Sequence, residues 1–113
     1  MQPDSAKYLF DVRRAAGLIA GFSSGRSFED YVADDMLKSA VERQFGIIGE
    51  ALARLAKVDP LVAEQVTDFR RIVAFRNILV HGYATVDDRI VWGVVEASLP
   101  GLIKSVEALL AGA

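Results

Sequence analysis

Apolar residues recur at helical spacing along the whole chain. Between residues 4 and 22 they fall three and four positions apart, which is the spacing of an amphipathic helix. A longer stretch, between residues 35 and 55, carries an apolar stripe in steps of four, four, three, four and three: Leu37, Val41, Phe45, Ile48, Leu52 and Leu55. Such a stripe is typical of a helix that packs inside a bundle.

Cap and turn residues separate these stretches. Ser27 opens a capping-box pattern, which predicts the start of a short helix. Asp34 or Asp35 is then expected to cap the long helix. Asp59 and Pro60 interrupt the chain after the long helix. A brief turn then leads to Thr67, the expected N-cap of another helix over residues 68–81.

The last part of the chain continues the same pattern. One helix is expected to begin at Thr85 or Asp87, and Pro100 either kinks it or starts a new helix. No stretch shows the alternation of a strand, and no linker or repeat divides the sequence. We therefore predict a single all-α domain over residues 1–113, a bundle of about five helices with short connections.

Composition narrows the range of functions. The chain has 113 residues, no Cys and one His, which excludes a disulfide scaffold, a thiolate zinc site and any metal site that takes two imidazoles from one chain. The net charge of −2 argues against a broad basic surface for nucleic acid but leaves room for a local basic site. No secretory signal and no apolar stretch long enough for a membrane span is visible, so we expect a cytoplasmic protein.

The hydrophobic content is high for so small a domain. It amounts to 52% of the residues, with a mean hydropathy of +0.28. A domain of this size keeps much of its surface exposed, so an excess of apolar residues indicates a face that another chain covers. On this ground we expect an oligomer.

One predicted helix breaks the apolar pattern with an arginine. Arg76 lies four residues from both Ile72 and Val80 and therefore on an apolar stripe. A buried guanidinium without a partner costs about 3–5 kcal/mol, so we expect either a carboxylate partner or a wet crevice. Glu50 is a candidate partner, although Arg54, four residues after it, offers an ordinary surface pair instead.

Three further polar residues follow Arg76 closely. Asn77 and His81 are four residues apart and share a helix face, so the amide of Asn77 could hold the ring of His81. Tyr83 stands just past the expected end of the helix. Each residue also has a purely structural interpretation: a satisfied core amide for Asn77, an interaction with the helix dipole for His81, and packing for Tyr83.

Residues 76–83 read RNILVHGY, an R-x-x-x-x-H-x-Y pattern with Asn directly after the Arg. Together with IIGEA in the long helix and VDDRIVW…LP near the end of the chain, this pattern resembles the HepT-like toxins of the HEPN superfamily of helical ribonucleases. The likeness extends over nearly the whole sequence. It implies a metal-independent endoribonuclease that works without a cofactor, as the toxin of a type VII-like toxin–antitoxin pair.

The same resemblance implies partners. The toxin is expected to be a homodimer with its RNA crevice at the dimer interface, and tRNA is one candidate substrate. Its antitoxin is expected to be a small nucleotidyltransferase of the MntA type, which transfers AMP to the motif tyrosine, here Tyr83. An AMP group there would occupy Arg76 and repel RNA phosphates, which would switch the toxin off.

The residue types suit metal-free cleavage of RNA. The ribose 2′-OH is an internal nucleophile, and a His near pH 7 serves its proton transfers, each worth about 10²–10⁴-fold. We assign these transfers to His81 and the phosphate to Arg76, whose guanidinium donates two hydrogen bonds at once. Asn77 would orient His81 or contact the phosphate, and Tyr83 would contact the sugar or phosphate. Glu50 would support Arg76, and two imidazoles would require two chains.

Two other functions fit the same pattern. The chain could be a noncatalytic helical partner that presents a substrate to a separate nucleotidyltransferase, with the polar cluster as a nucleotide site. It could also be a purely structural dimerisation bundle. A ribonuclease assay separates the three hypotheses, because the second predicts binding without cleavage and the third predicts no activity to lose.

Overall fold

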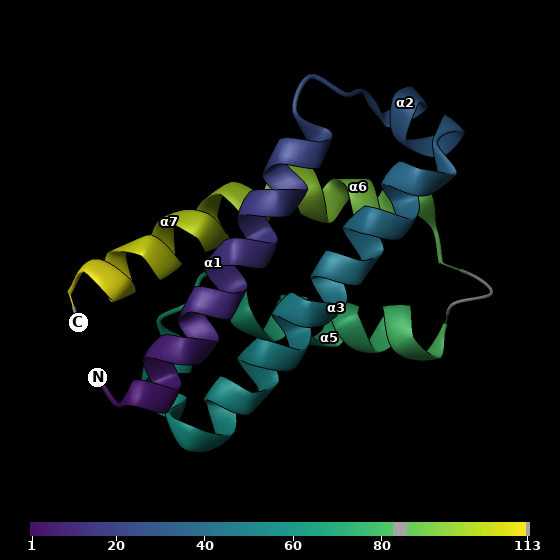
Figure 1. Ribbon diagram of the computed structural model, residues 1–113. Coiled ribbons are helices and arrows are strands. Elements are labelled where there is room, and N and C mark those ends of the chain that lie inside the picture. Colours follow the sequence, from purple (N-terminus) through teal and green to yellow (C-terminus); the bar gives the residue numbers. More distant parts are fainter. Residues whose placement is uncertain (83–85, 113) are drawn as a thin grey trace.

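The computed structural model describes residues 1–82 and 86–112, and within them the chain forms seven helices and no strand. Figure 1 shows these helices: α1 (Pro3–Ser23), α2 (Phe28–Ala33), α3 (Asp35–Val58), α4 (Pro60–Glu64), α5 (Phe69–His81), α6 (Asp88–Ala97) and α7 (Leu99–Ala111). The predicted all-α fold is confirmed. None of these helices is both long and apolar enough to cross a membrane.

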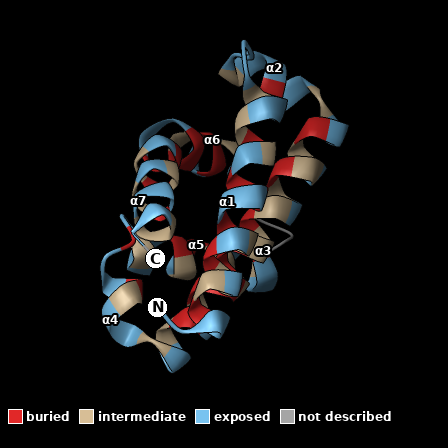
Figure 2. Cartoon of the chain, turned by 60° about the vertical axis from the view of Figure 1, so that its left-hand side comes forward, coloured by how far each residue is buried: buried red, intermediate tan, exposed pale blue. Residues whose placement is uncertain are grey.

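The two longest helices, α1 and α3, run antiparallel side by side, and α5 packs against α3 (Figure 1). The predicted apolar stripe of α3, from Leu37 to Leu55, is buried in the core. Phe45 of α3 meets Phe75 of α5 edge to face, with ring centres 5.1 Å apart, an arrangement that aromatic pairs prefer. Figure 2 shows that the buried residues lie on the inward sides of the helices.

Local signals set several helix boundaries as the sequence predicts. The hydroxyl of Ser27 accepts a hydrogen bond from the N–H of Asp30 at 3.1 Å, and the carboxylate of Asp30 accepts one from the N–H of Ser27 at 2.9 Å. Asp34 caps α3 by accepting from the N–H of Leu37 at 3.0 Å. These contacts satisfy backbone donors that the first turn of a helix leaves unpaired.

The described chain has more helices than the predicted five because one connection is itself helical and because a separate helix begins near Pro100. Asp59 accepts a hydrogen bond from the N–H of Val62 at 3.3 Å and so caps the short helix α4, where the sequence suggested a brief turn. Pro100 stands in the first turn of α7. Of the two outcomes left open for this proline, the structure contains the new helix.

The start of α5 differs from the prediction. Asp68, not Thr67, precedes the first helical residue, and it has a left-handed φ of 59° and makes no side-chain capping bond. Thr67 instead donates its backbone N–H to Oγ of Ser105 in α7, at 3.0 Å. A contact with a distant helix therefore takes part in placing the entry to α5, and no local sequence pattern contains that information.

Candidate active site

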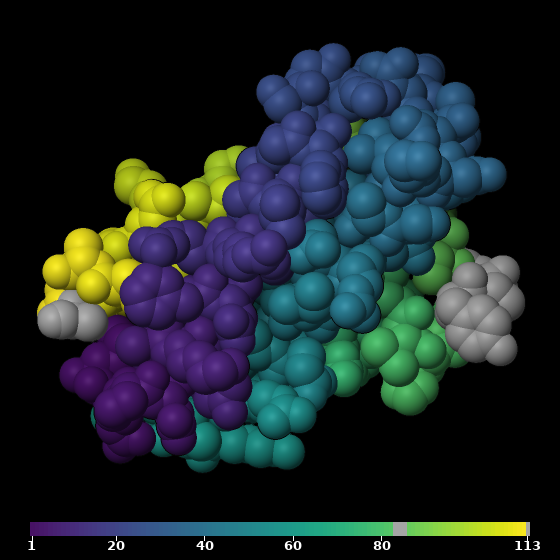
Figure 3. Space-filling model, in the orientation of Figure 1, coloured from purple at the N-terminus to yellow at the C-terminus, as the bar shows by residue number. Residues whose placement is uncertain are grey.

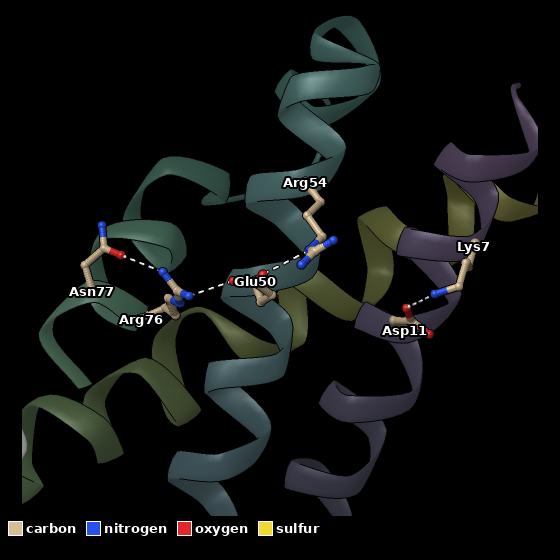
Figure 4. A network of polar contacts seen from close by, with 6 residues as sticks. All are labelled: Lys7, Asp11, Glu50, Arg54, Arg76 and Asn77. Carbon is tan, nitrogen blue, oxygen red and sulfur yellow. Dashed lines mark hydrogen bonds and ion pairs between the residues drawn. The ribbon is translucent and has the colours of Figure 1, made fainter. Parts of the chain in front are cut away.

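Arg76 extends from α5 toward α3, where it meets Glu50 (Figure 4). Nη2 of Arg76 lies 2.6 Å from Oε2 of Glu50, and Nε of Arg54 lies 2.9 Å from Oε1 of the same carboxylate. The sequence left open whether Glu50 pairs with Arg76 or with Arg54, and the carboxylate binds both. The side chain of Arg76 is 28% exposed, so the predicted carboxylate partner and the predicted access to solvent occur together.

The stem of Arg76 lies directly over Gly49 of α3. A Cβ added at Gly49 would stand 2.5 Å from Cγ of Arg76 and closer still to its Cβ, well inside the normal separation of two carbon atoms. The missing side chain therefore lets α5 approach α3 and sets the guanidinium beside Glu50. The R-x-x-x-x-H-x-Y pattern does not contain Gly49, and the sequence signal for it is a glycine inside a helical pattern, within the IIGEA segment.

Asn77 holds the other side of the guanidinium. Its Oδ1 accepts a hydrogen bond from Nη1 of Arg76 at 3.1 Å, whereas no hydrogen bond joins Asn77 to His81 in the described part of the chain. A guanidinium has five N–H donors, and these contacts with Asn77 and Glu50 use only two of them. Arg76 is thus held in place while it retains donors for an anion such as a phosphate.

His81 is the last residue of α5, and it is exposed. No described residue forms a hydrogen bond with its ring. It follows Arg76 by five residues, about 140° further around the helix, so the two side chains leave α5 in different directions. The structure therefore brings Arg76 together with Asn77 and Glu50 and keeps His81 as a separate, accessible imidazole. The fifth predicted residue, Tyr83, lies outside the described residues.

Two arginines keep Glu50 ionised. A hydrogen bond from Arg54 is the main cause that holds the pKa of the Glu50 carboxyl below its usual range, and the charge of Arg76 adds to it, while partial desolvation opposes both. The pKa of Arg54 is raised in return, first by its hydrogen bond with Glu50 and then by Tyr8. The counter-ion of Arg76 therefore stays charged through the neutral range.

Arg76 also lines an open groove of about 890 Å³ between α1, α3 and α5. Figure 3 shows α1 and α3 side by side on one face of the molecule. Acidic and basic side chains are mixed in this groove and largely paired, since Lys7 binds Asp11 at 3.1 Å and Glu50 binds two arginines. No three acidic or His side chains of residues 1–82 and 86–112 are grouped so that they could hold a metal ion.

Comparison with known proteins identifies the family. A family model described as "Ribonuclease HepT-like" matches residues 12–109. The chain belongs to this HepT-like family. Among its relatives is "Probable ribonuclease HepT" of Thermococcus cleftensis, 31% identical over 109 residues, which cover 96% of this chain and 98% of the relative. "Putative RNase MJ1380" of Methanocaldococcus jannaschii is 29% identical over 104 residues, covering 92% and 94%. No solved structure matches the chain.

Membership of the HepT-like family is consistent with the residues that the fold brings together. The matched region contains the whole of α3 and α5, and therefore Glu50, Arg76 and His81. The resemblance noted in the sequence is thus confirmed at the level of the family.

Proposed function

We propose that this HepT-like protein is a metal-independent endoribonuclease that cleaves RNA by attack of a ribose 2′-OH on the adjacent phosphate. One observation carries the proposal: the guanidinium of Arg76 is held by Glu50 and Asn77 at 2.6 and 3.1 Å, keeps donors free, and shares α5 with an exposed imidazole. A positioned cation and a His are the kinds of group that this reaction can use in place of a metal ion.

Arg76 would bind the phosphate that is cleaved. Negative charge accumulates on the phosphate oxygens in the transition state, and a fixed guanidinium stabilises it with charge-assisted hydrogen bonds. Glu50 and Asn77 would act as orienting residues, because they fix the plane of the guanidinium before the substrate arrives. His81 would take the 2′-OH proton or give a proton to the leaving 5′-oxygen.

A second copy of the chain would complete the site. Cleavage benefits from both an acid and a base, and the chain contains one His. Val80, the residue before His81, is 47% exposed, so apolar surface lies uncovered next to the imidazole, as expected for an interface. We infer a homodimer in which the two copies of His81 share one crevice.

In this proposal the protein is the toxin of a toxin–antitoxin pair in the cytoplasm, with tRNA as one candidate substrate. An MntA-like nucleotidyltransferase would transfer AMP from ATP to the oxygen of Tyr83 and release pyrophosphate. The bound AMP would place a phosphate two residues after His81, where it competes with RNA for Arg76. The expected consequence is an enzyme that loses RNA binding when it is modified.

The first test is cleavage of cellular RNA by the purified protein in the presence of EDTA. Arg76→Ala and His81→Ala should each lower the rate by about 10²-fold or more, and the products should end in 2′,3′-cyclic phosphate. Arg70→Ala is a matched control, since Arg70 is also on α5 but forms an exposed ion pair with Glu64. Cleavage that continues unchanged in both motif variants would refute the assignment.

The second test concerns the antitoxin. A nucleotidyltransferase encoded beside this chain, supplied with labelled ATP, should label the wild type and leave Tyr83→Phe unlabelled, and the labelled protein should no longer cleave RNA. If the wild type binds RNA or nucleotide without any cleavage, the protein is a noncatalytic partner instead.

A further inference from the structure

A second groove, of about 410 Å³, lies between α5 and α6. Arg71, Ala74 and Ile78 line it from α5, and Arg89, Ile90 and Val94 line it from α6. Two arginines and no carboxylate are found among the described residues of its walls. In a chain with a net charge of −2, this is a local basic site of the kind that the composition left open.

The two arginines of this groove are available to a ligand. Arg71 and Arg89 are exposed, and neither forms an ion pair with another described residue. The larger groove differs in this respect, because three carboxylates stand among the four cationic side chains of its walls, and Glu50 alone binds two of the arginines. The smaller groove therefore presents the stronger unopposed positive charge to an anionic ligand.

The groove leads to the imidazole. Arg71, Ala74, Ile78 and His81 follow one another in steps of three, four and three and so lie along one face of α5. The distance along the helix axis from Arg71 to His81 is about 15 Å, which is the length of a few nucleotides. A strand that follows this face would pass from the arginines to His81.

Apolar side chains in the groove are exposed in a position to contact bases. Ile78 is 49% and Ile90 is 50% exposed, and they line the groove from α5 and α6. Base faces are flat and apolar, and they gain contact energy when they pack on such side chains. A single strand presents both phosphate charges and base faces, and the walls of this groove contain both arginines and exposed isoleucines.

We propose that the groove between α5 and α6 binds the single-stranded RNA that adjoins the scissile phosphate, with Arg71 and Arg89 on backbone phosphates and Ile78 and Ile90 against bases. The identification of the ligand as RNA rests on the proposed function. A second copy of the chain is a poorer occupant, because symmetric packing of this groove would bring the arginines of both copies together.

The test is a binding measurement in the His81→Ala background, which separates binding from cleavage. The probe is a fluorescently labelled single-stranded oligoribonucleotide. Arg71→Gln with Arg89→Gln should raise its Kd by about tenfold or more at low salt and reduce the slope of log Kd against log salt by about 1.4, since each phosphate contact contributes about 0.7. The matched control, Arg14→Gln with Lys104→Gln, removes the same charge from α1 and α7 and should change the Kd less than about twofold.

Two further measurements test whether RNA or a second copy of the chain occupies the groove. Ile90→Ser should weaken binding by about threefold without a change of salt slope, and it should leave the sedimentation of the protein unchanged. In the background with His81 intact, the double arginine variant should raise KM for RNA with little effect on kcat.

The proposal is overturned if the double arginine variant leaves the Kd and the salt slope unchanged, or if it weakens RNA binding no more than the control pair does. It is also overturned if Ile90→Ser converts a dimer to a monomer, because a second copy would then occupy the groove. Failure of the wild type to cleave RNA would refute the proposed function, while the binding assay would still report on the groove.

Discussion

At the scale of single residues, Arg76 differs from the other arginines of the chain in how firmly it is held. Its side chain is 28% exposed, compared with 60% for Arg54 and 75% for Arg70, and it has both an acidic and an amide partner. Binding orders flexible side chains at an entropic cost. A guanidinium that is already fixed loses less freedom on binding a phosphate, which favours catalysis over mere attraction.

The acid titration of Glu50 tests this network. Because its pKa is lowered in the folded protein, Glu50 contributes stability that is present above its ordinary pKa of about 4.3 and is lost as the pH falls through the lowered pKa. We expect Arg54→Gln and Arg76→Gln each to raise the pKa of Glu50, as measured by NMR titration of its carboxyl carbon. Arg70→Gln is the control, and an equal rise in this variant would contradict the network.

The close approach at Gly49 gives a second test at this scale. Gly49→Ala should destabilise the protein by about 1–3 kcal/mol, because the new methyl group overlaps the stem of Arg76. Gly17→Ala on α1 meets nothing within 4 Å and should stabilise by about 0.5–1 kcal/mol. Urea denaturation measures both. If the free energy of unfolding rises by a similar amount in the two variants, α3 and α5 are not in contact at this position.

The sequence predicted that Arg76 needs a partner, but it did not predict the close approach of Arg76 to Gly49. An arginine on an apolar stripe needs a partner or solvent for reasons of charge alone, so this need could be foreseen from spacing, while Glu50 was only a candidate for the partner. The role of Gly49 could not be foreseen, because it depends on which helix packs against α3 and at what rotation. That information arises only when segments far apart in the sequence come together.

At the scale of the elements, Tyr31 joins α2 to α6. It is fully buried, its ring lies 5.2 Å from that of Trp92, and its hydroxyl has no hydrogen-bond partner in the described part of the chain. A buried hydroxyl without a partner lowers stability. The contact between α2 and α6 therefore combines favourable ring packing with an unfavourable polar atom.

Tyr31→Phe should stabilise the protein by about 1 kcal/mol at neutral pH. Burial, followed by the charges of Glu42 and Asp88, raises the pKa of Tyr31. Stability linked to its neutral hydroxyl is therefore fully present below the ordinary pKa of about 10 and is lost as the pH rises toward the raised value. Urea denaturation at pH 8 and pH 11 should show a smaller alkaline loss for Tyr31→Phe than for wild type. Tyr8→Phe is the control, and the same reduction there would argue against this origin.

The elements also show where prediction from sequence succeeds. The caps at Ser27 and Asp34 were predictable, because each involves residues within one turn of the helix start. The entry of α5 was not, because Thr67 bonds to Ser105, which lies 38 residues away. Helix existence depends on local periodicity, whereas this boundary depends on the tertiary fold.

At the scale of the whole molecule, the proposed pairing of two imidazoles predicts how mixed dimers behave. If wild type and His81→Ala are mixed in equal amounts and reassociate at random, about a quarter of the dimers contain two imidazoles. RNA cleavage should then fall to about a quarter of the wild-type rate. A rate of about half would instead mean that each chain acts alone, and sedimentation would verify that mixed dimers form.

The two grooves beside α5 also belong to this scale. The motif on α5 was visible in the sequence, but the surfaces that flank it are built by α1, α3 and α6 as well. The two grooves differ in charge because Glu50 pairs with the arginines of the larger groove, whereas no carboxylate is found among the described residues that line the smaller one. The sequence therefore indicated the chemistry of the helix but not the paths by which a ligand reaches it.

The overlap that any side chain at residue 49 would cause has an evolutionary consequence. The atom that such a side chain would meet first is the Cβ of residue 76, which every amino acid except glycine has. Among related chains that keep this helix packing, residue 49 should therefore stay glycine whether or not residue 76 is arginine. A larger residue at 49 is expected only where the two helices lie further apart, and an arginine at 76 would there lose the close carboxylate partner that Glu50 provides here.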